Sequence, residues 1–400
     1  MQVSRNPVLA PFQRAIASLT PDENHTLLLR ALILPAKEAN TAWLAWCERV
    51  GSPQAFFERN TRGLKGLLPV LQFAVQKNEI AIDRTFATYL RAARLREELR
   101  LKIIREVVAE LRDKLAERGI SPIWLRGYPL SETIYPDPCL RHCHGLYLLV
   151  PNASRAAAAL GPRFSRIPRL IFTAEGVLLK HASRLPVAIS SRLLQLPGED
   201  RLTELVRSRV EPAQLHALRG DRLSAADALL ETIANAALSP SRCNLRWVID
   251  SKQLLQSSTP AIWDPFLQAT EASNMALPVA LILEYFRRDL DFDIPAHAMQ
   301  RMHELTEKTN SMLLEAFLLT ARHGSRERFA DIIKALPDSR SRLRLIRALV
   351  LPRWSLLGWR YSNLPQYLTP ALYPWHLFLF GTRRVRSLSS PNEELISAAN

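Results

Sequence analysis

The chain has 400 residues, of which 48% are hydrophobic and 23% charged, as in an ordinary soluble globular protein. Its net charge is +15 and its pI about 10.1, and a basic surface attracts nucleic acid, nucleotides, anionic lipid or an acidic partner. The alternative is that an arginine-rich coding bias makes the chain basic, because the basic residues are spread along it. Four cysteines without paired Cys-x-x-Cys motifs exclude a disulfide framework.

The apolar stretches of the chain are short. No window approaches the ~18 uncharged apolar residues that a membrane helix needs. The first residues, "MQVSRNPVLAPFQRA", lack the continuous apolar region and the cleavage site of a signal peptide. We therefore expect a cytoplasmic protein without a membrane span.

The first region, residues 1–118, is predicted to be helical. Its clearest segment begins at Arg84, and its apolar positions step by four, three and four along one helix face. Gly119 follows the last apolar position, where a residue in the left-handed conformation is expected to end the helix. The apolar positions that define this face are Ile104, Val108, Leu111 and Leu115.

The second region, residues 119–198, changes to an α+β pattern. Short apolar runs predict strands, and Asn152 is the expected N-cap of a helix between two of them. Glu175 and Gly176 mark a hairpin-like turn. The expected strands are 121–127, 145–150, the two halves of 169–181, and 185–190.

The third region, residues 199–350, is predicted to be helical again. Residues 351–400 form a basic, aromatic-rich tail, which either packs on the helices or stacks on nucleic-acid bases. The expected fold class is therefore α+β, with a small mixed-sheet module embedded in a predominantly α-helical protein. The expected helices of the third region are 223–238, 245–256, 276–290 and 296–324.

The stretch "IWLRGYPLSETIYPDPCLRHCHGLYLLVP" resembles a family of uncharacterised bacterial nucleotidyltransferases in the polymerase-β superfamily. Members carry a strand ending in Leu-Lys-Gly, a Tyr-Pro-Asp-Pro-like turn, an arginine, and a strand reading Asp-hydrophobic-Asp-Leu-Leu-Val-Pro. A later strand reads Val-Asp-Leu-His, and a helix with a Leu-Arg-Trp pattern follows, as in "NLRWVIDSKQLL" here. The resemblance covers most of residues 80–300 and implies a nucleotidyltransferase-type sheet. The corresponding segments of this chain are 125–127, 135–138, Arg141, 148–151 and 187–190.

The resemblance also implies three aspartates, because nucleotidyl transfer uses Mg²⁺ held by carboxylate oxygens. The corresponding positions here are Gly145, Tyr147 and Ala188, and none of these side chains can replace a carboxylate. Between Pro138 and Gly198 the chain has one acidic residue, Glu175. The same interval has eight basic residues, namely Arg141, Arg155, Arg163, Arg166, Arg169, Lys180, Arg184 and Arg192. Such a pocket would repel Mg²⁺ and attract phosphate.

Five residues are candidates for binding a phosphorylated ligand. Gly127 and Tyr128 lie where the family's glycine turn approaches a nucleotide, and the alternative is a turn that only preserves the fold. The candidate cations are Arg126, Arg141 and Lys180. For Arg126 and Arg141 the alternative is a structural ion pair with Glu132 or Asp137, and Asp250 is expected to cap or pair within the helical domain.

Two other chemistries are weaker alternatives. His142, Cys143 and His144, with His181 as a distant fourth ligand, offer nitrogen and sulfur to Zn²⁺, but Cys143 would face away from the two histidines along a strand. Ser190 and Ser191 near His181 lack a third residue at a spacing typical of a hydrolase.

The sequence therefore predicts a nucleotidyltransferase-like protein that is catalytically silent and has no cofactor. It would bind a nucleotide or phosphorylated ligand, or support a partner enzyme in a bacterial biosynthetic pathway. One alternative is an active transferase that uses Mg²⁺ and other carboxylates, for example Asp137, Glu175 and Asp200. The other is a basic scaffold that binds nucleic acid or an acidic protein.

Overall fold

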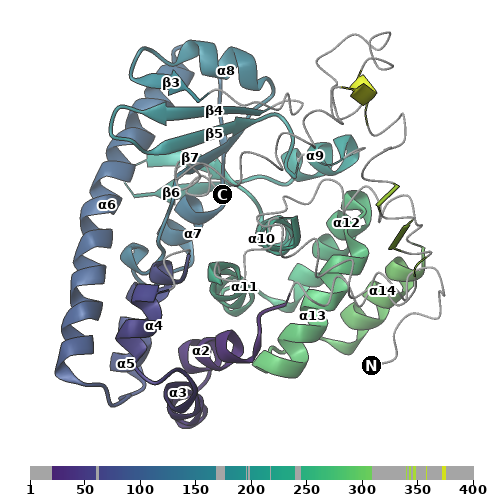
Figure 1. The fold of residues 1–400 in the computed structure, drawn as a ribbon. Coiled ribbons are helices and arrows are strands. Elements are labelled where there is room, and N and C mark those ends of the chain that lie inside the picture. Colours follow the sequence, from purple (N-terminus) through teal and green to yellow (C-terminus); the bar gives the residue numbers. More distant parts are fainter. Residues whose placement is uncertain are drawn as a thin grey trace.

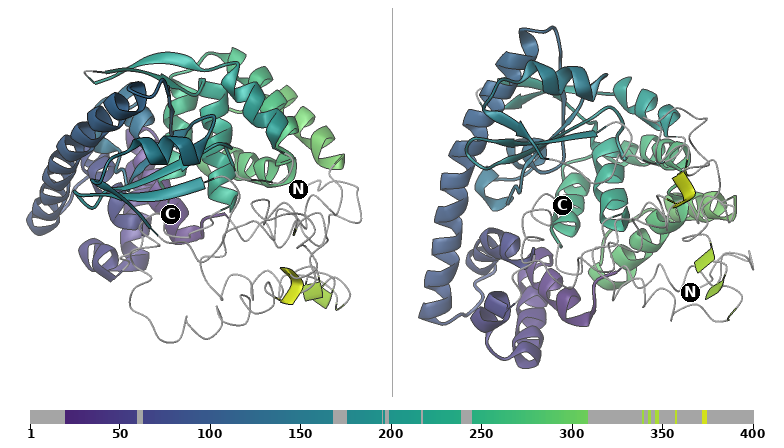
Figure 2. Two further views of the ribbon diagram at one scale, coloured as in Figure 1. Left: turned by 90° about the horizontal axis from the view of Figure 1, so that it is seen from above. Right: turned by 45° about the horizontal axis from the view of Figure 1, so that its top comes forward.

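The computed structural model contains a mixed sheet with helices on both sides (Figure 1). The long helix α6 and the C-terminal helices lie on opposite sides of the molecule, as the views in Figure 2 also show. The structure describes residues 20–59, 63–167, 176–194, 196, 199–216, 218–238 and 245–308, with 339, 342–343, 346–347, 357 and 372–374. The predicted strand before Glu175, that residue itself and most of the tail lie outside this part.

The described part of the N-terminal region, from residue 20 to the end of the long helix, is mostly helical. The first helix in this described part begins after Asp22, whose carboxylate accepts a hydrogen bond from the backbone N–H of His25 at 3.0 Å. The helices before the long one are α2 (Glu23–Ile33), α3 (Ala36–Val50), α4 (Pro53–Arg59), η1 (Leu64–Leu67) and α5 (Leu68–Lys77).

Helix α6 (Arg84–Ala116) has 33 residues and spans about 50 Å at ~1.5 Å per residue. Asp83 caps it, because its carboxylate accepts a hydrogen bond from the N–H of Phe86 at 2.8 Å. Gly119 adopts a φ of 65°, which confirms the predicted left-handed residue after the helix.

Among the described residues, the sheet has seven strands in the order β3-β4-β5-β2-β1-β7-β6. Strand β2 is antiparallel to β1 and parallel to β5, so it lies between two strands of opposite direction. Asn152 caps the helix after β2 by accepting from the N–H of Arg155 at 2.9 Å, as predicted. The strands are β1 (Ile123–Leu125), β2 (Leu146–Leu149), β3 (Phe164–Arg166), β4 (Gly176–His181), β5 (Pro186–Ser190), β6 (Glu211–Leu215) and β7 (Leu218–Arg222).

Strands β6 and β7 were not predicted, because residues 199–350 were expected to be helical. The two strands form a hairpin in which β7 pairs in parallel with β1, so the sheet continues past residue 198. Their sequences, "EPAQL" and "LRGDR", have few β-branched or aromatic residues. Pairing with the existing sheet, rather than intrinsic propensity, therefore determines their conformation.

The remaining described helices lie beside the sheet or, like α12, α13 and α14, pack on one another away from it (Figure 1). Helix α13 (Ala276–Leu290) begins and ends at the predicted residues. The others are α7 (Gly127–Thr133), η2 (Pro138–Leu140), α8 (Ala153–Ala159), α9 (Asp200–Arg207), α10 (Ala225–Leu238), α11 (Arg246–Gln256), η3 (Pro260–Ile262), α12 (Trp263–Ser273) and α14 (Ala296–Glu307). In the described residues, no helix is long and apolar enough to cross a membrane.

The two faces of the sheet belong to two different hydrophobic cores. Ile123 and Leu125 of β1 lie in the larger core, with α10, α11 and most other helices, whereas Trp124 lies in the smaller core. The smaller core also contains the C-terminal half of α6 and helix α8. Tyr147 of β2 packs on the larger core, so its side of the sheet faces the helical domain.

Candidate functional site

Two of the three positions at which the resemblance leads us to expect aspartates lie on neighbouring strands. Tyr147 of β2 is opposite Leu125 of β1 and beside Ala188 of β5. Gly145 directly precedes β2, two residues before Tyr147. The fold thus brings positions 147 and 188 side by side, and their side chains are a phenol and a methyl group.

Gly145 has no room for a side chain. A Cβ atom at this position would lie 2.6 Å from the carbonyl oxygen of Pro186 and 2.8 Å from its Cγ. A contact this close with backbone cannot be relieved by rotating a side chain. Strand β5 therefore occupies the space that an aspartate at position 145 would need.

The ring of Tyr147 lies under the guanidinium of Arg126, whose Cζ is 4.1 Å from the ring centroid. Arg126 also donates to Oδ1 of Asn235 at 2.7 Å and lies 3.4 Å from a carboxylate oxygen of Glu231. Glu231 has an almost fully buried side chain. Arg126 therefore neutralises a buried carboxylate of α10 rather than one of the predicted partners Glu132 and Asp137.

Gly127 and Tyr128 begin helix α7 in a tightly packed region. A Cβ at position 127 would lie 3.1 Å from both Nη1 of Arg141 and Sγ of Cys143. Tyr128 is 1% exposed, and burial raises the pKa of its phenol. Among the described residues its hydroxyl has no hydrogen-bond partner. Gly127 and Tyr128 therefore both pack closely against other parts of the protein in this conformation.

Arg141 forms a two-point ion pair with Asp250 of α11. Its Nε and Nη2 donate to the two carboxylate oxygens, each at 2.7 Å, and both side chains are largely buried. The hydroxyl of Tyr135 donates to the same carboxylate at 2.7 Å. Burial, with Asp250 beside it, raises the pKa of Tyr135 well above its usual range. The partner of Asp250 was expected within the helical domain, but it is Arg141, which lies in the segment before β2.

The predicted partners of these arginines are bound elsewhere. Glu132 accepts from Arg105 of α6 at 2.8 Å, and Asp137 pairs with Arg94 of the same helix. Asp137 also caps η2 by accepting from the N–H of Cys139 at 2.8 Å. Helix α6 therefore supplies the cations for both carboxylates.

The two histidines of the His-Cys-His segment bind each other and a carboxylate. Nδ1 of His142 lies 2.5 Å from Oε1 of Glu97, and Nε2 of His142 lies 3.1 Å from Nδ1 of His144. His181 instead contacts Glu110 of α6 at 3.2 Å. Within the described residues no group of three or more His, Cys, Asp or Glu side chains can hold a metal ion.

The pKa values of both histidines are far below their usual range. Burial is the largest cause, and the guanidinium groups of Arg246, Arg100 and Arg141 add to it. These effects outweigh the contact of His142 with Glu97. Both imidazoles are therefore neutral in the folded protein near neutral pH.

Arg246, at the start of α11, was not singled out from the sequence. It is 6% exposed, and its Nε and Nη1 have no hydrogen-bond partner in the described part of the chain. Burial and the nearby Arg141 lower its pKa to about 10. Its neighbours Arg141 and Arg126 form ion pairs with Asp250 and Glu231, whereas Arg246 forms no ion pair within the described residues; its charge opposes the burial that raises the pKa of Glu97.

The part of the chain that contains these residues matches a known protein family. The model of the uncharacterised nucleotidyltransferase family matches residues 64–291, more than half of the chain. The protein belongs to this family. No curated protein matches this chain. The matched segment contains α6, the whole sheet and the Arg141–Asp250 pair.

The family's chemistry implies Mg²⁺, and the residues at the three family positions do not fit this ion. Mg²⁺ requires oxygen ligands in near-octahedral geometry, whereas Gly145 and Ala188 offer no side-chain oxygen. Tyr147 offers only a phenol beneath a guanidinium. Of the alternative carboxylates, Asp137 pairs with Arg94 and Asp200 with Arg192, while Glu175 lies outside the described residues.

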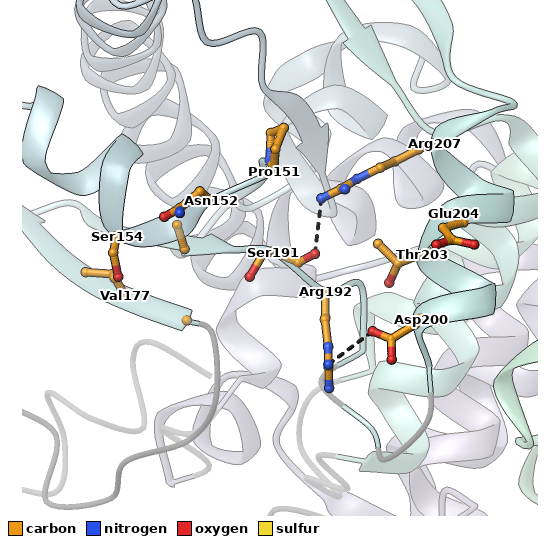
Figure 3. A pocket seen from close by; sticks show the side chains of 12 residues that line it. Pro151, Asn152, Ser154, Val177, Ser191, Arg192, Asp200, Thr203, Glu204 and Arg207 are labelled. Carbon is orange, nitrogen blue, oxygen red and sulfur yellow. Dashed lines mark hydrogen bonds and ion pairs between the residues drawn. The ribbon is translucent and has the colours of Figure 1, made fainter. Parts of the chain in front are cut away.

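A pocket of this nucleotidyltransferase-like module lies at the opposite end of β2 (Figure 3). It has a volume of about 420 Å³, within the range of small-molecule sites. Its walls are the segments that follow β2 and β5, the start of β4, and helix α9. The polar and charged lining residues are Asn152, Ser154, Ser191, Arg192, Asp200, Thr203, Glu204 and Arg207.

Two arginines approach this pocket from different elements. Arg207 extends from α9 and donates to the carbonyl oxygens of Val150 at 2.9 Å and Ser191 at 3.1 Å. Arg192 lies 3.0 Å from Asp200, whose carboxylate is mostly exposed. Lys180 lies on β4 opposite Pro186, and β5 separates it from β2. Arg192 and Arg207, the two arginines that line the pocket, were not among the predicted ligand residues.

Proposed function

We propose that this nucleotidyltransferase-like protein is catalytically silent. The observation that carries the proposal is the register of the sheet, which sets Tyr147 beside Ala188 while Pro186 fills the space at Gly145. Nucleotidyl transfer needs metal-bound carboxylates at these positions, and a phenol, a methyl group and a hydrogen atom supply none. Because Pro186 fills the space at position 145, a single substitution to aspartate there would not restore the missing carboxylate.

We further propose that the protein binds a nucleotide or another phosphorylated ligand, or supports a partner enzyme. Among the candidate cations, Arg126 and Arg141 are bound to buried carboxylates. Removing either for a ligand would leave an unpaired buried charge. The pocket lined by Arg192 and Arg207 is therefore better suited to phosphate, since Arg192 would exchange a largely exposed partner, Asp200, for the ligand.

Calorimetric titration with ATP, with and without Mg²⁺, tests this function. Binding that does not require Mg²⁺ supports a silent protein with a phosphate-binding pocket. Binding that requires Mg²⁺ would overturn catalytic silence and support the active-transferase alternative. Absence of ATP binding would reject the nucleotide and leave the supporting role or the basic scaffold.

Two substitutions locate the ligand. Ser154→Trp places a large ring at an exposed position of the pocket and is expected to abolish ATP binding. Arg287→Gln removes an exposed arginine of α13 that pairs with Glu284, far from this pocket in the sequence, and the variant is expected to bind ATP like the unmodified protein. Equal binding by the unmodified protein and the Ser154→Trp variant would reject this pocket.

A further inference from the structure

Helix α6 carries an exposed apolar stripe on its outer side. Leu95, Leu99 and Ile103 are 57%, 55% and 41% exposed, and they follow each other at intervals of four residues. Residues four apart lie on one helix face, so the three side chains form a continuous row. Scattered exposed leucines are common, whereas a row at helical spacing is typical of a helix-packing surface.

The charges beside the stripe differ between the two halves of the helix. Beside the stripe, the exposed charged side chains up to Lys102 are basic, and those that follow Ile103 on the same face are acidic. The basic side chains are Arg84, Arg91, Arg96 and Lys102, and the acidic ones are Glu106, Asp113, which also pairs with Arg112, and Glu117. A groove of about 430 Å³ begins at Ile103 and continues along Glu106, Asp113 and Glu117, with Lys114 and Arg163 also in its lining.

We propose that this face binds the same face of a second copy of the chain, with the two α6 helices antiparallel. A two-fold axis at Leu99 sets this residue against its own equivalent, and it sets Leu95 against Ile103 of the second copy. The same register brings Arg91 near Glu106 of the second copy and Arg84 near its Asp113. The contact between the two Leu99 side chains forms once, on the axis, and each of the other contacts forms twice because the interface is symmetric.

The charge pattern favours this occupant over others. A parallel pair of α6 helices would bring the basic halves together and the acidic halves together. An anionic lipid surface would attract the basic half and repel the acidic half. An antiparallel copy satisfies both halves and also opposes the two helix dipoles.

The mass of the protein in solution is the first test. Light scattering coupled to size-exclusion chromatography is expected to give twice the 45.3 kDa of one chain. Leu99→Glu sets two carboxylates against each other on the axis and is expected to reduce the mass to one chain. Leu44→Glu, at a 63% exposed position of α3, is the matched control and is expected to remain dimeric. A single-chain mass for the unmodified protein would overturn the proposal.

Cysteine cross-linking tests the register. Leu99→Cys is expected to form a covalent dimer on mild oxidation, because the residue meets its own equivalent. Leu95→Cys alone is expected to give none, and Leu95→Cys with Ile103→Cys is expected to restore it. The unmodified chain, with its native cysteines, is the control under the same oxidation. A dimer that Leu99→Cys does not cross-link would reject this interface.

Charge reversal gives an independent test of the predicted pairs. Arg91→Glu is expected to raise the dissociation constant of the dimer at least ~5-fold, and adding Glu106→Arg is expected to restore it. If the double variant dissociates as readily as the single one, the two residues do not meet in the dimer.

Discussion

The guanidinium of Arg141 lies flat against the carboxylate of Asp250, with two nitrogen–oxygen distances of 2.7 Å. The two residues are 109 positions apart, and their pair joins the segment before β2 to helix α11. Arg246 lies close to this pair and forms no ion pair within the described residues, although its charge also acts on Glu97. One of these two buried arginines therefore has a direct carboxylate partner and the other has none, and substitutions can distinguish their effects on stability.

Asp250→Ala is expected to lower the free energy of unfolding by about 3–5 kcal/mol, because it leaves the Arg141 charge buried and unpaired. Urea unfolding followed by circular dichroism measures the change. Glu284→Ala removes the partner of the half-exposed Arg287 and is expected to cost less than ~1 kcal/mol. Equal losses for the two variants would contradict the importance of the buried pair.

Arg246→Met is expected to leave stability unchanged or to raise it by about 1–4 kcal/mol, because it replaces a buried cation that forms no ion pair within the described residues with an apolar side chain of similar length. The matched variant is Arg141→Met, which leaves Asp250 without its cation and is expected to destabilise the protein. Thermal unfolding of the two variants in phosphate-free buffer ranks them. A larger loss for Arg246→Met than for Arg141→Met would show that Arg246 has a partner of its own.

Gly145→Ala is expected to destabilise the protein by about 1–3 kcal/mol, because the new Cβ would lie 2.6 Å from the carbonyl oxygen of Pro186. Gly161→Ala is the control, since the nearest atom to its Cβ would be Nζ of Lys114 at 3.7 Å. Chemical denaturation compares the two variants. Similar stabilities would mean that β5 yields easily at this position.

The triple variant with aspartate at 145, 147 and 188 is expected to show no nucleotidyl transfer. Pro186 occupies the space of the first carboxylate, and Arg126 would pair with the second. Release of pyrophosphate from ATP in the presence of Mg²⁺ is the measurement, with the unmodified protein as the baseline. Activity above that baseline would show that the site lacks only its carboxylates.

Stability is expected to fall as the pH decreases below about 6.5, the usual pKa of histidine. The unfolded chain binds protons at His142 and His144 in this range, whereas the folded protein keeps both neutral because their pKa values are lowered. Each histidine therefore removes up to ~1.4 kcal/mol of unfolding free energy per pH unit, and the contribution is complete above pH ~6.5.

Urea unfolding at pH 7.5 and pH 5.5 measures this dependence. The variant with His142→Gln and His144→Gln is expected to lose less stability between the two pH values than the unmodified protein. If both proteins lose the same amount, other groups cause the acid sensitivity.

Local signals in the sequence predicted much of the fold. The periodic apolar face of α6, the N-cap at Asn152 and the glycine at 119 act within a few residues of chain, and the structure confirms each of them. The hairpin of β6 and β7 was missed because its residues favour no strand on their own. Its conformation depends on pairing with β1, about 100 positions earlier.

The candidate site, like the fold, could be predicted from the sequence only in part. The residue types at positions 145, 147 and 188 are visible in the sequence, and so is the scarcity of acidic residues around them. The partners of Arg126 and Arg141 are not, because Glu231 and Asp250 lie more than 100 positions away. An unpaired buried arginine such as Arg246 leaves no local signal at all, since its burial depends on packing between distant segments.

Helix α6 belongs to both hydrophobic cores. Phe86 and Leu90 near its start lie in the larger core, and Val108 and Leu111 lie in the smaller one. Helix formation is cooperative, so melting one half of α6 removes support from the other. The sheet and the helical bodies are therefore expected to unfold together in one transition, and damage to either core weakens the whole molecule.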